Sequence, residues 1–287
     1  MTPPGSAFSA QREYPFSPGE FRRVRDLIAR LAGIALAEHK ENMVYNRLAR
    51  RLRGTGIPSF GEYLDLVEQP DSGERGHFVN ALTTNLTSFF REGHHFEMLA
   101  DYAAARRRAS PGGARLRVWS GACSTGEEPY SAAIVLREAD CPADILATDI
   151  DTEVLSRARR GSYALDAAES LSPERLRRFF LKGVGANEGR IMVRPELQAM
   201  VRFSQCNLQG DNWPSGEGFD VIFCRNVMIY FSRESQRQVL DRFIGMLRPG
   251  GLLFVGHSES YATGHAALRS CGKTAYERRV VDSPRAS

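Results

Sequence analysis

Apolar side chains recur at helical spacing through the first ninety residues. Ser17–Glu20 matches a capping box with proline at the first helical position. The apolar positions after it fall at three- and four-residue intervals, at Phe21, Val24, Leu27, Ile28 and Leu31. Further helical stretches are expected at about 38–53, 60–67 and 78–82. We therefore predict a small all-α domain over residues 16–90, after a disordered lead-in over residues 1–15.

From residue 116 onward, strand-like runs alternate with helical stretches. The strand-like runs are Leu116–Trp119, Ile145–Thr148, Met200–Phe203, Val221–Cys224 and Leu252–Val255. The helical stretches are Glu128–Arg137, Thr152–Arg159 and Ser232–Leu247. This alternation predicts an α/β domain over residues 91–287 with a doubly wound, mostly parallel sheet. Two strand-like runs flank the glycine-rich loop of FFLKGVGANEGRIMVRPEL, which predicts a β-hairpin inserted at about 161–200.

Composition narrows the class of protein. With 287 residues and 42% hydrophobic side chains, the chain can bury the cores of two domains. It has no apolar run of about 18 residues and no signal-peptide pattern, so we expect no membrane insertion. The five cysteines are scattered without a C-x-x-C pair, which favours a reducing cytoplasm over disulfides or a zinc site. A net charge of +4 does not by itself indicate nucleic acid.

The stretch RVWSGACSTGEEPYSAAIVL, Arg117–Leu136, has the strand, glycine loop and helix that often hold a nucleotide-type ligand. It contains neither G-x-G-x-x-G nor G-x-x-x-x-G-K-[ST]. Glu127 and Glu128 instead occupy the place where a phosphate binder offers bare backbone N–H groups, and they would repel a phosphate. By themselves, the two glutamates could equally be charges favoured by the helix dipole.

Polar residues also follow the other predicted strands. Asp149 ends the second strand, near the roughly 20-residue offset after the glycine loop at which an acidic residue takes ribose hydroxyls. Asp149 could instead cap the next helix, although Asp151 is better placed to do so. Asn207-Leu208 follows the third strand and Arg225-Asn226 the fourth. A ligand with a ribose, a flat base and a positively charged tail suits this set, and S-adenosylmethionine has all three.

Five motifs together carry a resemblance to a known family. They are HKENMVYNRLARRLR, ALTTNLTSFFREGHHF, VWSGACSTGEEPYS, ATDIDTEVL and IFCRNVMIYF. With these motifs the chain resembles the CheR family of chemotaxis receptor methyltransferases over nearly its whole length. The resemblance implies a helical N-terminal domain and a Rossmann-like methyltransferase domain with an antiparallel β insert. It also implies a cytoplasmic enzyme that transfers methyl from S-adenosylmethionine to glutamate side chains of chemoreceptors for chemotactic adaptation, leaving S-adenosylhomocysteine.

The resemblance also assigns residues. It places the cofactor pocket at Asn85, Thr87, Arg91, Glu128, Asp149, Asn207, Leu208, Arg225 and Asn226. It implies that Glu128 takes the methionyl amino group and Asp149 the ribose, and that Arg91 and Tyr230 contribute to catalysis. Judged from the residues alone, Arg91 could pair with Glu92 or Asp101 on the surface, and Tyr230 could fill the core beside Phe231.

Between Lys40 and Arg53, the second predicted helix carries five basic residues against one acidic residue, Glu41. The basic residues are Lys40, Arg47, Arg50, Arg51 and Arg53. A solvated face, nucleic acid or an acidic protein partner would each explain them, and the resemblance favours glutamate-rich receptor helices. It names the β insert as a second docking surface, which in some members grips the C-terminal tail of a receptor. We expect a monomer that binds no nucleic acid.

Other candidates are judged minor. Adjacent His94 and His95 cannot both face one metal from a helix, so we expect a helix surface there and no metal site. For His257, a packing or hydrogen-bonded role is expected near the cleft. Two rival functions are a methyltransferase of the same fold acting on another protein, a nucleic acid or a small molecule, and a non-catalytic cofactor-binding scaffold. Amino-methylating enzymes carry an N/D-P-P-Y loop where this chain has Asn226-Val-Met-Ile-Tyr230.

Overall fold

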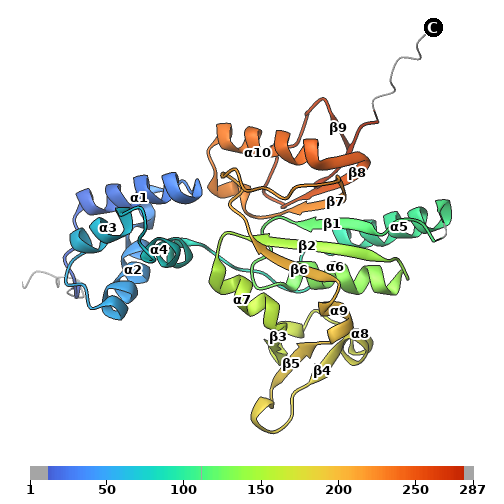
Figure 1. Ribbon diagram of the computed structural model, residues 1–287, viewed down its shortest axis with the longest axis horizontal. Helices are drawn as coiled ribbons and strands as arrows, with labels where there is room; N and C mark the ends of the chain where they lie inside the picture. The colour runs from blue at the N-terminus through green and yellow to red at the C-terminus, as the bar shows by residue number, and fades with distance from the viewer. Residues whose placement is uncertain (1–11, 111, 281–287) are drawn as a thin grey trace, which may run out of the picture. The chain divides into compact units, whose positions relative to one another are not determined.

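The computed structural model describes residues 12–110 and 112–280, and this part of the chain divides into two compact units after Thr83 (Figure 1). The division falls earlier in the chain than the boundary expected after residue 90. Both units have the secondary structure expected of them, helices in the first and an α/β arrangement in the second. Each unit is described by itself.

The N-terminal unit is helical, as predicted. Its elements are α1 (Pro18–Ala32), η1 (Glu38–Lys40), α2 (Glu41–Thr55), α3 (Phe60–Glu68) and α4 (Glu74–Leu82). The capping box before α1 is present, because the Ser17 side chain accepts from the backbone N–H of Glu20 while the Glu20 carboxylate accepts from that of Ser17. α1 and α2 end at Gly33 and Gly56, whose φ angles of 70° and 73° lie in the left-handed region that favours glycine.

Residues 12–15, the described end of the expected lead-in, contact α2. Arg12 donates hydrogen bonds to Glu41 Oε1 at 2.9 Å and Asn42 Oδ1 at 2.7 Å. The next residues are anchored as well, because the Phe16 ring lies 4.4 Å from that of Phe60 between centroids. The rest of the lead-in, residues 1–11, lies outside the described residues.

The C-terminal unit is built on a seven-stranded sheet in the order β6-β2-β1-β7-β8-β10-β9 (Figure 1). Its parallel strands are β1 (Leu116–Ser120), β2 (Ala143–Asp149), β6 (Val201–Gln205), β7 (Phe219–Cys224) and β8 (Leu247–Val255). These confirm the five predicted strands. The antiparallel pair β9 (Leu268–Gly272) and β10 (Ala275–Arg278) closes one edge and was not predicted. β9 exposes all but its first residue, so it carries no apolar alternation by which a strand is recognised.

Helices cover both faces of this sheet. They are α5 (His94–Ala109), α6 (Glu127–Glu138), α7 (Thr152–Arg160) and α10 (Arg233–Met246). Side chains of α5 and α6 share one hydrophobic cluster with the sheet, and α10 packs into a second cluster around Trp119. α6 is buried at every position from Glu127 to Leu136, and not only on the apolar face expected from its spacing, because the sheet, α5 and the insert surround it.

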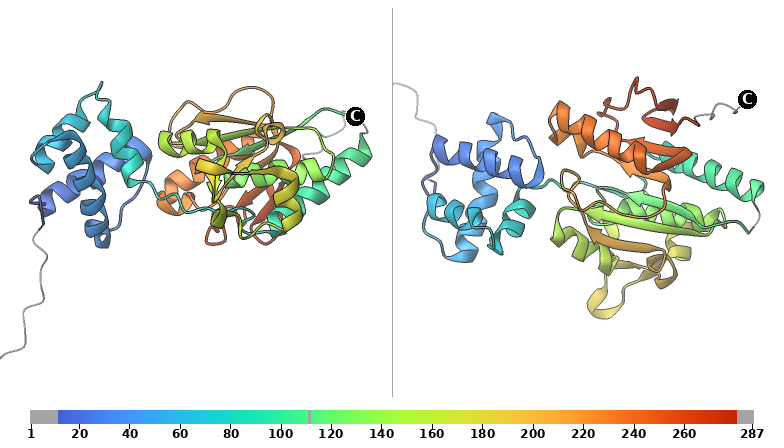
Figure 2. Two further views of the ribbon diagram at one scale, coloured as in Figure 1. Left: turned by 90° about the horizontal axis from the view of Figure 1, so that it is seen from below. Right: turned by 45° about the horizontal axis from the view of Figure 1, so that its top comes forward.

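The β insert is present and has one strand more than predicted. Its elements are β3 (Ser162–Ala164), η2 (Leu165–Ala168), α8 (Pro173–Phe179), β4 (Phe180–Lys182), η3 (Gly185–Asn187), β5 (Arg190–Val193) and α9 (Pro195–Gln198). β4 and β5 form the predicted hairpin, and β3 pairs with the other side of β5. Figure 2 shows this small sheet, in yellow, extending away from the large one.

Among the described residues, no helix combines the length and the apolar character that crossing a bilayer requires.

Candidate functional site

Predicted cofactor-binding residues follow four strands at the carboxyl edge of the sheet. β1 lies between β2 and β7, so the strand order reverses beside it. In an open parallel sheet, ligands bind in the crevice outside the carboxyl ends of the strands at such a reversal. The loops after β1, β2, β6 and β7 meet there, and each carries residues singled out in the sequence.

Backbone hydrogen bonds fix the glycine loop after β1. Gly121 N–H donates to Phe223 O at 2.8 Å and Cys123 N–H to Thr148 O at 2.9 Å, which ties the loop to β7 and β2. Gly126 precedes α6 with φ 99°, and a Cβ there would lie 2.9 Å from Tyr163 Oη. Glycine is required at this position on both counts, and it brings the N-terminus of α6 to the crevice.

The carboxylate of Asp149 joins the end of β2 to this loop. It is only 8% exposed; its Oδ2 accepts from Ser124 N–H at 2.8 Å and its Oδ1 from Asp151 N–H at 3.0 Å. Burial raises the pKa of Asp149 to about 6. The cap of α7 is Asp151, which accepts from the N–H groups of Glu153 and Val154, as expected. Each Asp149 oxygen keeps lone-pair capacity for a further donor.

The paired glutamates have different surroundings. Glu128 accepts from Ser120 Oγ and from Arg225 Nε, both at 2.6 Å, so a buried ion pair offsets its charge. Glu127 accepts from Thr125 Oγ1 at 2.6 Å, and burial raises its pKa. The two carboxylates therefore present one compensated and one uncompensated charge at the start of α6.

Arg225 is the centre of a buried network that the sequence did not reveal. Its Nη1 donates to Arg91 O at 2.6 Å and to His95 Nδ1 at 3.2 Å. Burial first, and then the charge of Arg225, lowers the pKa of His95 to about 3, so the imidazole is neutral. With Nδ1 accepting, its Nε2–H donates to Thr274 Oγ1 at 3.0 Å.

The expectation that His94 and His95 form a helix surface is therefore wrong for His95, which is 0% exposed. The helix turns it inward, where it packs 4.8 Å from the Phe254 ring and meets Arg225. Sequence spacing could not show this, because both neighbours are distant in the chain.

Arg91 is held at the crevice by neutral groups. Its Nη1 donates to Leu86 O at 2.7 Å and its Nη2 to Asn226 Oδ1 at 3.0 Å. Asn226 in turn donates through Nδ2 to Glu92 Oε1 at 3.1 Å. The surface pairings of Arg91 with Glu92 or Asp101 are not formed within the described chain. Asn226 and Glu92 have left-handed φ angles of 60° and 56°, the kind of backbone strain that concentrates at functional sites.

The segment before Arg91 also reaches the glycine loop. Asn85 Nδ2 donates to Asp151 Oδ2 at 2.8 Å, and Ser124 Oγ donates to Asn85 O at 3.0 Å. Thr87 lies half-buried in the same segment. The chain that enters α5 thus brings Asn85 and Arg91 to the strand ends, and Thr87 lies between them in the sequence.

Asn207 and Leu208 follow β6 beside Asp149. Cys206 N–H donates to Asp149 O at 3.0 Å, which sets the start of their loop. Asn207 Oδ1 accepts from Gln209 N–H at 2.9 Å, and the Leu208 side chain is buried in the cluster with Trp119.

Tyr230 ends η4 (Met228–Tyr230), the short helix after β7. It is half-buried, and its ring packs against the cluster under α10. Glu259, which sequence reasoning missed, accepts hydrogen bonds from this loop. The motif GHSES drew attention only to His257, whose side chain is exposed and whose N–H lies 3.4 Å from Glu92 Oε1.

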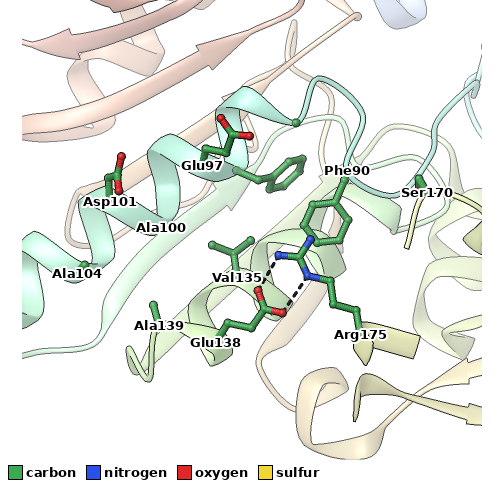
Figure 3. A pocket seen from close by; sticks show the side chains of 12 residues that line it. Phe90, Glu97, Ala100, Asp101, Ala104, Val135, Glu138, Ala139, Ser170 and Arg175 are labelled. Atoms are coloured by element: carbon green, nitrogen blue, oxygen red, sulfur yellow. Dashed lines mark hydrogen bonds and ion pairs between the residues drawn. The ribbon is translucent and has the colours of Figure 1, made fainter. Parts of the chain in front are cut away.

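A groove of about 590 Å³ lies elsewhere in this unit, between α5, α6 and the start of the insert (Figure 3). Arg175 forms a two-pronged ion pair with Glu138 there, at 2.9 and 2.7 Å, and lies 4.2 Å over the Phe90 ring. None of the predicted site residues lines this groove.

The basic residues of the second predicted helix differ in their surroundings. Arg47 donates to Thr83 O at 2.6 Å, and Arg51 binds both oxygens of Glu74, at 2.8 and 2.9 Å. These two arginines join α2 to α4 and to Thr83, the residue that follows α4, within the N-terminal unit. The exposed ones are Lys40, Arg50 and Arg53, the last within 3.2 Å of Glu13.

Comparison with known proteins matches both units to one family. Residues 19–83 match the description "CheR methyltransferase, all-alpha domain" and residues 85–276 match "CheR methyltransferase, SAM binding domain". The chemotaxis protein methyltransferase of Escherichia coli K12 is 49% identical over 265 residues, 91% of each chain. That of Salmonella typhimurium LT2 is 50% identical, covering 91% of this chain and 90% of its own. Chemotaxis protein methyltransferase 2 of Pseudomonas aeruginosa PAO1 is 48% identical, covering 95% and 97%.

Proposed function

The chain belongs to the CheR methyltransferase family, and we propose how the residues at the carboxyl edge of its sheet hold S-adenosylmethionine and a receptor glutamate. The protein is an S-adenosylmethionine-dependent methyltransferase that forms methyl esters on glutamate side chains of chemoreceptors. The observation that carries the proposal is a pair of buried carboxylates: Glu128 in the first turn of α6, the helix that follows β1, and Asp149 at the end of the adjacent strand β2.

The cofactor fits this pair by charge and by hydrogen bonding. We assign the ribose hydroxyls to Asp149, because its oxygens retain acceptor capacity after two backbone N–H bonds. The α-ammonium and the sulfonium lie toward Glu127 and Glu128, where a cation is favoured and a phosphate is repelled. The flat base lies toward Asn207 and Leu208, and Asn85 and Thr87 line the entrance from the α5 side.

The reaction needs no general base. A glutamate side chain has an ordinary pKa of about 4.3 and is already an anion at neutral pH. One of its oxygens forms a bond to the methyl carbon as the carbon–sulfur bond breaks, and the electron pair leaves on sulfur, giving neutral S-adenosylhomocysteine. Because no proton moves, positioning of the acceptor in line with the departing sulfur supplies most of the acceleration.

Arg91 and Tyr230 are the proposed positioning groups for the acceptor carboxylate. Arg91 spends donors on Leu86 O and Asn226 Oδ1, and a guanidinium has five, so donors remain for an incoming carboxylate. The Tyr230 hydroxyl can donate one further hydrogen bond to the attacking oxygen. Both groups orient the nucleophile without taking its charge away.

We propose two receptor-binding surfaces. The first is the exposed part of the basic set, namely Lys40, Arg50 and Arg53, which suits a glutamate-rich helix. The second is the β insert, where β4 is an edge strand and Val184 and Met192 are exposed apolar side chains. An extended receptor tail can add to such an edge by main-chain hydrogen bonds. We further propose that the enzyme acts as a monomer in the cytoplasm.

The test is a methyl-transfer assay on membranes that contain receptors, with S-adenosylmethionine carrying a radioactive methyl group. Alkaline treatment of the product should release radioactive methanol, since a glutamyl methyl ester hydrolyses in base whereas methylated amines do not. Label that stays on protein or nucleic acid after alkali would instead support a methyltransferase of the same fold with another substrate.

A further inference from the structure

A buried glutamate in the turn after β8 accepts hydrogen bonds from the loop after β7. Glu259 is 4% exposed. Its Oε2 accepts from Asn226 N–H at 2.9 Å and from Gly256 N–H at 2.5 Å. Its Oε1 accepts from Val227 N–H at 3.0 Å and from Met228 N–H at 2.8 Å. One carboxylate thus satisfies four backbone donors, three of them in the loop that leads to Tyr230.

The charge of Glu259 is compensated by these donors. Burial raises the pKa of Glu259, and the four N–H groups oppose that rise because they stabilise the ionised form. A buried carboxylate without donors would be very costly, and buried N–H groups without an acceptor are costly as well. The loop and the glutamate therefore depend on each other.

Gly256 makes the approach possible. A Cβ at this position would lie 2.6 Å from Asn226 N and 2.6 Å from Glu259 Oε2, closer than real Cβ atoms come. Only glycine lets the end of β8 come this close to the loop after β7.

The contacts continue from Glu259 to both proposed catalytic groups. Asn226, held through its N–H, keeps its left-handed conformation and directs its side chain to Arg91 and Glu92. Val227 and Met228, held through theirs, set the start of η4, which ends at Tyr230. We infer that Glu259 is a positioning residue for methyl transfer: its carboxylate fixes the 226–230 loop and, through it, Arg91 and Tyr230. This inference rests on the proposed function.

If Glu259 only joined the segments that follow β7 and β8, replacing it would lower stability, and its effect on turnover would not depend on which residue occupies position 230. The decisive experiment is therefore a double-mutant cycle between Glu259→Gln and Tyr230→Phe, read as turnover at saturating cofactor and receptor. Glutamine keeps the shape but turns an amide N–H₂ toward the loop N–H groups. We expect Glu259→Gln alone to lower turnover roughly ten- to hundredfold. When Tyr230 is already phenylalanine, the same change should lower turnover by a clearly smaller factor, because only the part that acts through Arg91 remains.

Three further measurements keep the test independent of folding. Glu234→Gln makes the same chemical change at an exposed position of α10 and should leave turnover unchanged. Gly256→Ala should reproduce the loss without altering any charge. Turnover is expressed per enzyme molecule with bound cofactor, so a partly unfolded preparation does not count as a catalytic defect.

The outcomes separate the two claims. Turnover of Glu259→Gln equal to that of the parent, or equal factors of loss in both Tyr230 backgrounds, would overturn the inference while leaving the proposed function intact. If Tyr230→Phe turned over like the parent, the assigned role of Tyr230 would fail. A second cycle between Glu259→Gln and Asn226→Ala would then decide the inference, and additivity there would refute it.

Discussion

At the scale of single residues, the carboxylates at the strand ends are buried but not equivalent. Glu128 is paired with a buried arginine, Glu259 is surrounded by backbone N–H groups, and Asp149 has two such donors and spare acceptor capacity. Among these three, Asp149 alone combines burial, a raised pKa and room for further donors. It is the carboxylate whose protonation should be visible in cofactor binding.

The raised pKa of Asp149 predicts a pH dependence for that binding. Above pH of about 6 the group is ionised and accepts from the ribose hydroxyls; as the pH falls through about 6 it takes up a proton and one acceptor is lost. The dissociation constant for S-adenosylhomocysteine, measured by calorimetry between pH 5 and pH 8, should rise toward the acid end. Asp149→Asn should bind weakly with little pH dependence. A parent affinity that is constant across this range would contradict the assignment.

Tyr230 offers a test that separates chemistry from packing. Tyr230→Phe keeps the ring and its contacts under α10 but loses the hydroxyl. A hydrogen bond made mainly in the transition state is worth a few kcal/mol at most, so turnover should fall roughly ten- to thousandfold with cofactor affinity unchanged. Tyr230→Ala is the control for packing, because its cavity should lower thermal stability whatever the hydroxyl does. Equal turnover of the phenylalanine variant and the parent would remove Tyr230 from the mechanism.

The sequence allowed some of these residues to be predicted and not others. Asp149, Glu128 and Arg225 could be found because each follows a strand-like run, and strand ends meet at one edge of a sheet. The burial of His95 and the donors of Glu259 could not, because their partners are far away in the chain and a lone histidine or glutamate has no spacing to interpret.

At the scale of elements, the basic residues of α2 fall into two groups, one paired within the N-terminal unit and one exposed to solvent. Arg47 and Arg51, which looked available for a partner, are bound to Thr83 O and to the mostly buried Glu74 within their own unit. Tyr63 Oη donates to the same Glu74 at 3.0 Å, so the Glu74 carboxylate accepts hydrogen bonds from both Arg51 and Tyr63. Periodicity shows which residues share a face but not which of them are already paired.

Charge reversal on α2 should therefore have two distinct outcomes. Arg50→Glu, at an exposed position, should slow receptor methylation several-fold and leave the melting temperature nearly unchanged. Arg51→Glu is the matched comparison, and it should lower stability by about 2 kcal/mol or more because it places a second negative charge beside Glu74. Thermal melts and initial rates distinguish the two. Wild-type rates for Arg50→Glu would place the receptor-binding surface elsewhere.

At the scale of the whole molecule, the two-part architecture could be predicted because each part has its own hydrophobic period. Helical spacing predicted α1 to α4, and strand–helix alternation predicted β1, β2, β6, β7 and β8. The short strands β3, β9 and β10 were missed. β3 has only three residues, and β9 is almost wholly exposed, so their positions are set by pairing with β5 and β10 and not by local sequence.

Net charge leads to a further expectation for the whole protein. The chain carries +4 at pH 7, and its proposed partner is a glutamate-rich helix. The initial rate of receptor methylation at low receptor concentration should fall as salt rises from about 0.05 to 0.5 M, because exposed charges are screened within about 10 Å at 0.1 M. Cofactor affinity, which depends on buried groups, should change much less. A rate that does not respond to salt would argue against electrostatic docking.

The central claim is that the carboxyl edge of the sheet, with Asp149 at the end of β2, is the S-adenosylmethionine site. Calorimetric titration of S-adenosylmethionine and S-adenosylhomocysteine into the parent and into Asp149→Ala tests it most directly. The parent should bind both with dissociation constants on the order of micromolar, and Asp149→Ala should weaken both alike, by roughly tenfold or more, because the ribose is common to the two ligands. An Asp149→Ala protein that binds either ligand as tightly as the parent would contradict the account.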